Sequence, residues 1–68
     1  MDIEHLVTMA NEISAFFESE DQTTAVAQAA NHLRKFWDPH MRRQICEFAA
    51  ADGHGLSETA RRAVALLK

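Results

Sequence analysis

The sequence has few of the residues that build disulfide frameworks, tight turns and membrane spans. Among its 68 residues it has no Tyr, one Cys, one Pro, one Trp and two Gly. A single Cys excludes an internal disulfide and fits a reducing compartment. No apolar run approaches the roughly 18 residues of a transmembrane helix, and the acidic start differs from the basic start of a signal peptide. We therefore expect a cytoplasmic protein that does not bind a membrane.

The length allows a single domain over residues 1–68. Hydrophobic residues make up 47% of the chain, but many of them are Ala, which bury little area each. Below roughly 70–80 residues a single core seldom supplies more than about 3–5 kcal/mol of stability. We therefore expect either a partner subunit or self-association, and a homodimer is one form that the isolated chain could take.

Positive charge is missing from the first third of the chain. Residues 1–24 contain six acidic residues and no Lys or Arg, whereas residues 31–43 contain four basic residues and one acidic residue. Residues 44–68 contain equal numbers of each sign. The chain is thus a charge dipole, which influences orientation and partner choice rather than fold.

Apolar residues recur at helical spacing, and no window alternates with the period of two that strands require. The expected fold class is therefore all-α, a small bundle of about four helices. The predicted helices span approximately residues 3–18, 22–36, 39–51 and 57–67. The predicted N-caps are Asp2, Asp21, Asp38 and Ser57, and Gly53 is the predicted left-handed residue after the third helix.

A tight corner is predicted between the second and third helices. Pro39 suits the first position of a helix, and a residue that precedes Pro is forced out of the helical region. Asp38 is therefore placed as an N-cap, and Asp38 with Pro39 forms a structural corner that fixes the angle between the two helices.

The sequence contains no motif for metal binding or catalysis. Its four His and one Cys show no CxxC, HExxH or HxxxH spacing. Cys46 lies within a predicted helix beside Ile45, where a small buried thiol is common. The run 53–55 lacks the Lys and the preceding strand of a phosphate-binding loop. We predict no catalytic, metal-binding or cofactor-binding residues, and therefore no enzyme activity of the chain by itself.

Residues 30–43 are the most distinctive segment, because they contain the only Trp, the only Pro and four of the seven basic residues. Adjacent residues on a helix point about 100° apart, so Phe36 and Trp37 both face inward only if the helix is covered on two sides. The alternatives of core and interface stay open for this pair, and the adjacent pair Phe16 and Phe17 of the first helix poses the same question. Interfaces favour Trp, Phe, Met and Arg at their centres, which is the composition of this segment.

The basic residues of the same segment allow a second interpretation. Two helices joined at a tight corner beside several basic side chains could form a DNA-binding helix-turn-helix. The net charge of −3 argues against it, because nucleic-acid-binding domains are usually basic. A free-standing helical interaction module is a further alternative.

The middle segment resembles a known family. The string NHLRKFWDP at residues 31–39, followed by Met41 and Arg42, resembles the signature of the delta subunit of cytoplasmic NAD-dependent formate dehydrogenase. Residues 9–13 with the pair Phe16 and Phe17 are similar to the N-terminal helix of that family. Residues 44–68 match only as a helical tail with a Gly-containing loop, and His40 departs from the basic residue expected there.

The resemblance implies a non-catalytic accessory subunit of a multi-subunit enzyme. In that family the large subunit holds a molybdenum or tungsten pterin cofactor, and the delta subunit, itself without a cofactor, binds the large subunit and supports assembly, cofactor insertion or stability. The choice between a permanent subunit and an assembly factor stays open. The residues expected to bind the partner are Asn31, His32, Arg34, Lys35, Phe36, Trp37, Met41, Arg42 and Arg43.

Overall fold

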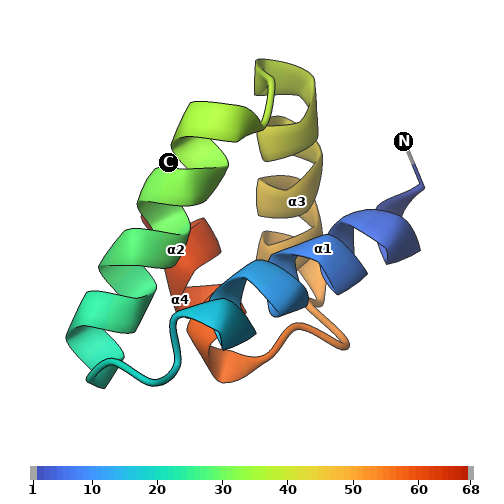
Figure 1. The fold of residues 1–68 in the computed structure, drawn as a ribbon. Coiled ribbons are helices and arrows are strands. Elements are labelled where there is room, and N and C mark those ends of the chain that lie inside the picture. The colour runs from blue at the N-terminus through green and yellow to red at the C-terminus, as the bar shows by residue number, and fades with distance from the viewer. Residues whose placement is uncertain (1, 68) are drawn as a thin grey trace.

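Residues 2–67, which the computed structural model describes, form helices joined by short loops, with no strand (Figure 1). The helices are α1 (Ile3–Phe16), α2 (Gln22–Phe36), α3 (Pro39–Ala51) and α4 (Glu58–Ala65). The prediction of a small all-α fold with about four helices is confirmed. The bounds of α2 and α3 agree with the predicted ones, whereas α1 and α4 are shorter than predicted.

Every helix begins at the N-cap that the sequence predicts. In each case a side-chain oxygen accepts a hydrogen bond from a backbone N–H two or three residues later, which satisfies a donor that the start of a helix leaves open. The N···O distances are 3.3 Å for Asp2–Glu4, 2.9 Å for Asp21–Thr24, 2.8 Å for Asp38–Met41 and 3.2 Å for Ser57–Ala60. The backbone hydrogen bond from Thr24, supported by its hydroxyl, holds the pKa of Asp21 below its usual range.

The two shorter helices end in tightened turns. After Phe16, the N–H groups of Phe17 and Glu18 donate to carbonyls three residues back, at 3.1 and 3.2 Å. Leu66 and Leu67 do the same after α4, at 3.1 and 3.0 Å. Such bonds belong to 3₁₀ geometry, which is frequent where α-helices end. The predicted α1 and α4 are longer because the apolar pattern continues into these tightened turns, beyond the last residue of each α-helix.

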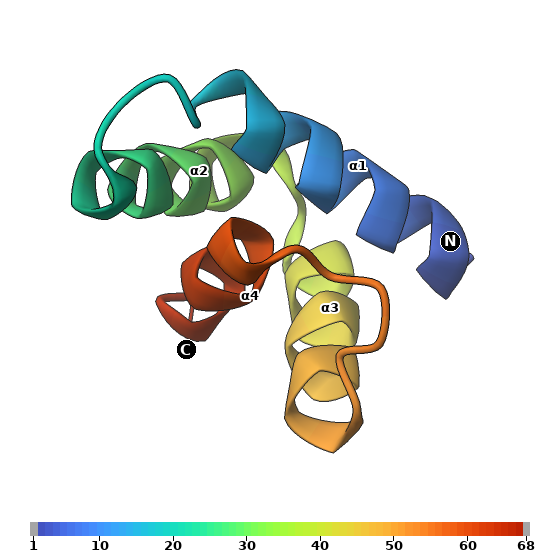
Figure 2. The ribbon, with the colours of Figure 1, turned by 90° about the horizontal axis from the view of Figure 1, so that it is seen from below.

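The core lies where α1 and α4 meet the other helices, because each of these two packs against all three others. In Figure 1, α4 lies behind α1 and α2, and in the view of Figure 2 it lies beneath them. A cluster of Ala29, Ala30 and Ala63, all at most 1% exposed, lets α2 and α4 approach closely. The main core cluster consists of Leu6, Ala10, Leu33, Trp37, Ile45, Leu56, Ala60 and Val64.

The loop between α3 and α4 is held by Asn11 of α1. The Asn11 Nδ2 donates to the Gly55 carbonyl at 2.8 Å, and its Oδ1 accepts from the Ser57 N–H at 2.9 Å. Gly53 has φ of 69°, as predicted for a left-handed residue after α3. The Arg61 guanidinium also donates to the Gly53 carbonyl at 3.0 Å. The side chains of Asn11 and Arg61 thus hold the loop near its two ends.

The two adjacent aromatic side chains at the corner between α2 and α3 differ in exposure. Trp37 is 5% exposed, whereas Phe36 is 70% exposed. The chain leaves the helical conformation at Trp37, with φ of −91° and ψ of 136°. Asp38 is extended as well, as a residue that precedes Pro is expected to be. The Trp37 indole belongs to the core, and Phe36 belongs to the surface.

Candidate docking surface

Two neighbouring hollows lie between α1 and α2 and together form one groove. The first, of about 330 Å³, is lined by Glu12, Ile13, Phe16, Phe17 and His32. The second, of about 420 Å³, shares Glu12, Ile13 and His32 and is completed by Met9, Phe36, Trp37 and Met41. Because three residues line both hollows, we treat them as one surface and name these nine residues the α1–α2 groove.

The walls of the α1–α2 groove are mostly apolar. Phe16 and Phe36 are 78% and 70% exposed, and together they leave large apolar surfaces in water. The Phe16 and Phe17 rings meet edge to face, with centroids 5.1 Å apart. The centroids of the His32 and Phe36 rings are 4.7 Å apart. Contiguous apolar patches of this kind on small proteins often mark sites of interaction.

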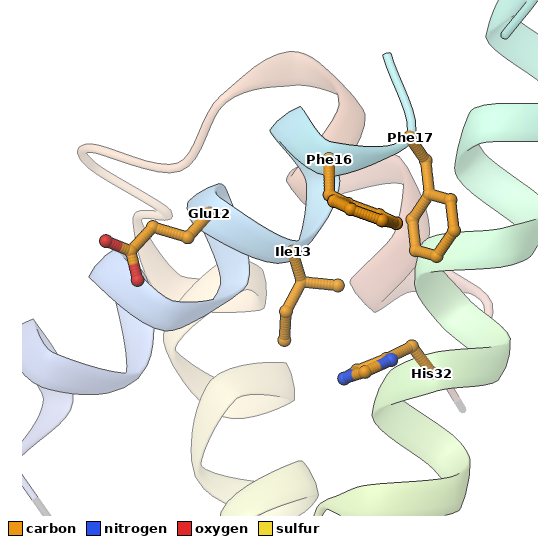
Figure 3. Close-up of a pocket in the computed structure, with 5 residues that line it drawn as sticks. All are labelled: Glu12, Ile13, Phe16, Phe17 and His32. Atoms are coloured by element: carbon orange, nitrogen blue, oxygen red, sulfur yellow. The ribbon is translucent and has the colours of Figure 1, made fainter. Parts of the chain in front are cut away.

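Figure 3 shows how the first hollow is built. Ile13 and the two Phe rings lie on the α1 side of the hollow, and the His32 ring points toward them from α2. The Glu12 side chain points outward at the rim, away from the Phe pair. The groove thus combines an apolar floor with one carboxylate at its edge.

The predicted partner-binding residues are divided over three surfaces. His32, Phe36, Trp37 and Met41 line the α1–α2 groove. Asn31 and Arg34 line a separate hollow on α2 with Thr23, Thr24, Ala27 and Gln28. Arg42 and Arg43 line a third hollow with Pro39, Cys46 and Leu67, and Lys35 is exposed. A helix turns by about 100° per residue, so a continuous string of sequence cannot present one face.

Two of the predicted partner-binding residues contribute to the fold itself. The Arg34 guanidinium donates to the Leu66 carbonyl at 2.9 Å, which places a cation at the C-terminal end of α4, where the helix dipole favours it. Trp37 fills the core, so little of its side chain is available to a partner in this conformation. The corner residues Asp38 and Pro39 occupy the predicted N-cap and first turn of α3.

The sequence-based expectation missed the contribution of α1 to the groove. Met9, Glu12, Ile13, Phe16 and Phe17 form one wall, yet none of them is among the residues expected to bind the partner, and for the pair Phe16 and Phe17 an interface stayed only an alternative. The adjacent pair Phe16 and Phe17 was the available signal, because two neighbouring bulky apolar residues cannot both reach a narrow core. Only the packing of α1 against α2 shows that this pair and Phe36 line the same groove.

Residues 2–67 contain no group of three or more His, Cys, Asp or Glu residues placed to hold a metal ion. None of the described helices has the length and apolar character needed to cross a membrane. The helices and the surface together define a small all-α fold with an exposed apolar groove.

Comparison with known proteins gives the family. Residues 5–64 match the family described as NADH-dependent formate dehydrogenase delta subunit FdsD, and the chain belongs to this family. The match extends beyond the residues that carried the resemblance in the sequence. No curated protein and no solved structure gives a significant match. Membership of this family implies that the chain is a subunit of a multi-subunit formate dehydrogenase.

Proposed function

We propose that the chain is a non-catalytic accessory subunit of a cytoplasmic NAD-dependent formate dehydrogenase. It binds the large subunit that holds the molybdenum or tungsten cofactor, and it supports assembly, cofactor insertion or stability of the complex. The observation that supports this proposal is the α1–α2 groove, where Phe16 and Phe36 stay exposed although the chain has a well-formed core. Membership of the delta-subunit family supports formate dehydrogenase as the enzyme that this surface binds.

The size of the chain is consistent with docking through one face. A stable interface covers about 800 Å² on each partner, and the surface of the chain measures 4209 Å², so docking would cover about a fifth of it. Burying one Phe side chain contributes about 1.5–3 kcal/mol. Two such side chains therefore give a gross gain of about 3–6 kcal/mol, enough for the groove to dominate binding.

The test is an affinity purification of the tagged chain from its native cytosol, followed by mass spectrometry and metal analysis. Recovery of the large subunit with its metal, in near-equal amounts, supports a permanent subunit. Recovery of the large subunit without its cofactor supports a factor that acts during assembly. If no formate dehydrogenase subunit is recovered, the proposed function is wrong.

A pair of variants tests whether the groove carries the binding. Phe36→Ser should reduce recovery of the large subunit at least ten-fold, because it removes one of the two exposed rings of the groove. Leu66→Ser is the matched control, since Leu66 is also an exposed apolar residue, 50% exposed, but does not line the groove. Equal recovery with both variants would show that the binding surface lies elsewhere.

A further inference from the structure

We propose that the α1–α2 groove binds one amphipathic helix of the partner subunit, and that a Lys or Arg beside the apolar anchors of that helix pairs with Glu12. This inference rests on the proposed function and specifies the chemistry of the partner segment. It follows from the spacing of the two hollows, from the nature of the walls and from the charge of α1.

The two hollows are displaced by about one helical turn along α1. The α1 residues that line the second hollow are Met9, Glu12 and Ile13, and those that line the first are Glu12, Ile13, Phe16 and the following Phe17. The centres of these two sets differ by about three residues, or roughly 5 Å at 1.5 Å per residue. Side chains at positions i and i+3 or i+4 of a helix have this spacing, so one helix can place an apolar anchor in each hollow.

The walls favour a helix over an extended peptide. An extended peptide gains affinity mainly by adding a strand to an exposed sheet edge, where backbone N–H and C=O groups are open. Both walls of the groove are α-helices whose backbone groups are bonded internally. The groove therefore offers apolar side chains and no backbone ladder, which is the recognition mode of an amphipathic helix.

Charge complementarity sets the polar part of the partner. Glu12 lines both hollows and makes no ion pair with any residue in the described range 2–67. The acidic residues Glu18 and Glu20 follow the Phe pair, and residues 1–24 contain no Lys or Arg. A helix laid against α1 thus meets only negative charge on this wall. A basic side chain beside its apolar anchors satisfies Glu12 at the rim of the groove.

A second copy of the chain is a poorer occupant. In a two-fold symmetric dimer, residues near the axis face their own copies. Glu12 lines both hollows, so a two-fold axis that passes close to Glu12 would bring two Glu12 carboxylates together. Like charges placed opposite one another across an interface are unfavourable. The partner helix has no such conflict.

The experiment uses the formate dehydrogenase complex purified without this chain, to which the chain is added back. Binding is compared for Glu12→Lys and for the matched control Glu47→Lys, which makes the same charge change at an exposed α3 residue outside both hollows. We expect Glu12→Lys to weaken binding at least ten-fold and Glu47→Lys to change it less than two-fold. Circular dichroism of both variants should match that of the unmodified chain.

Photo-crosslinking then identifies the occupant. A benzoylphenylalanine residue is placed at position 16 or, separately, at position 36, where the natural rings are exposed. Both positions should crosslink to one amphipathic helix of the partner, within about two turns of each other and beside a Lys or Arg. Crosslinks to a strand or to a helix without a basic residue would overturn the inference, and so would crosslinks to a second copy of the chain.

The outcomes separate this inference from the proposed function. If the unmodified chain binds the complex but Glu12→Lys and Glu47→Lys bind equally well, the inference is wrong and the proposed function stands. If the unmodified chain binds no subunit of the complex, the proposed function itself is wrong and the inference fails with it.

Discussion

Asn11 is the residue whose substitution should most clearly reveal how the fold is held together. Its side chain joins α1 to the loop before α4 through two hydrogen bonds, to the Gly55 carbonyl and from the Ser57 N–H. A protein hydrogen bond contributes about 0.5–1.5 kcal/mol net to stability. Asn11→Ala should therefore lower the free energy of unfolding by about 1–3 kcal/mol. A core of this size seldom supplies more than about 3–5 kcal/mol, so the loss is a large fraction of the total.

Asn11→Asp tests the geometry more sharply, because it keeps the acceptor and removes the donor. At neutral pH the second oxygen of the introduced carboxylate would face the Gly55 carbonyl, to which Asn11 donates at 2.8 Å. The protonated acid can donate a hydrogen bond there, so folding favours the protonated form and raises the pKa of the introduced carboxyl above its unfolded value of about 3.9. The variant should approach wild-type stability below the unfolded pKa. This stability should be lost as pH rises through the folded pKa.

The measurement is urea unfolding of the isolated chain between pH 3 and pH 7, followed by circular dichroism and by the fluorescence of Trp37. Each variant is compared with the unmodified chain at the same pH, which removes the effect of the other carboxylates. Asn31→Ala is the control, since Asn31 is exposed on α2. The reasoning is refuted if Asn11→Ala costs no more than the control, or if the deficit of Asn11→Asp does not shrink in acid.

Three further predictions concern the fold. Gly53→Ala should lower the urea midpoint more than Gly55→Ala. Both have positive φ, but an added Cβ at Gly53 would displace the Arg61 guanidinium and break its hydrogen bond to the Gly53 carbonyl, whereas that at Gly55 would meet only Val7 at ordinary van der Waals distance. Trp37→Ala should abolish most of the helical circular dichroism, because truncating a buried aromatic side chain costs about 3–5 kcal/mol. Retained helicity would contradict this core position. Asp21→Asn should weaken the pH dependence of stability below about pH 4. The lowered pKa of Asp21 contributes stability that is present above the unfolded pKa and lost as pH falls through the folded one.

Local structure was predictable from the sequence because its determinants are local. An N-cap such as Asp38 acts within three residues, and Pro39 restricts only its neighbours. Helical spacing places Trp37 on the apolar stripe that contains Leu33, but it does not decide between core and interface for Phe36 and Trp37, since adjacent helix positions differ by which other helix covers them. The hydrogen bond from Arg34 to the Leu66 carbonyl was not predictable either, because the two residues are 32 positions apart in the sequence. The groove required two helices to be placed side by side, which no single periodicity specifies.

The position of Phe36 connects the stability of the fold to docking. Its neighbour Trp37 is buried in the core, where the chain leaves the helical conformation, whereas Phe36, the last residue of α2, is exposed beside it. A partner that binds only the folded chain stabilises it by about 2.7 kcal/mol when present at a hundred times its dissociation constant. A variant such as Asn11→Ala, which weakens the fold and leaves the groove intact, should therefore recover its stability in the complex. Phe36→Ser should behave in the opposite way, remaining folded when isolated and being lost from the complex. A comparison of the two variants, alone and with the partner, separates residues that hold the fold from residues that bind.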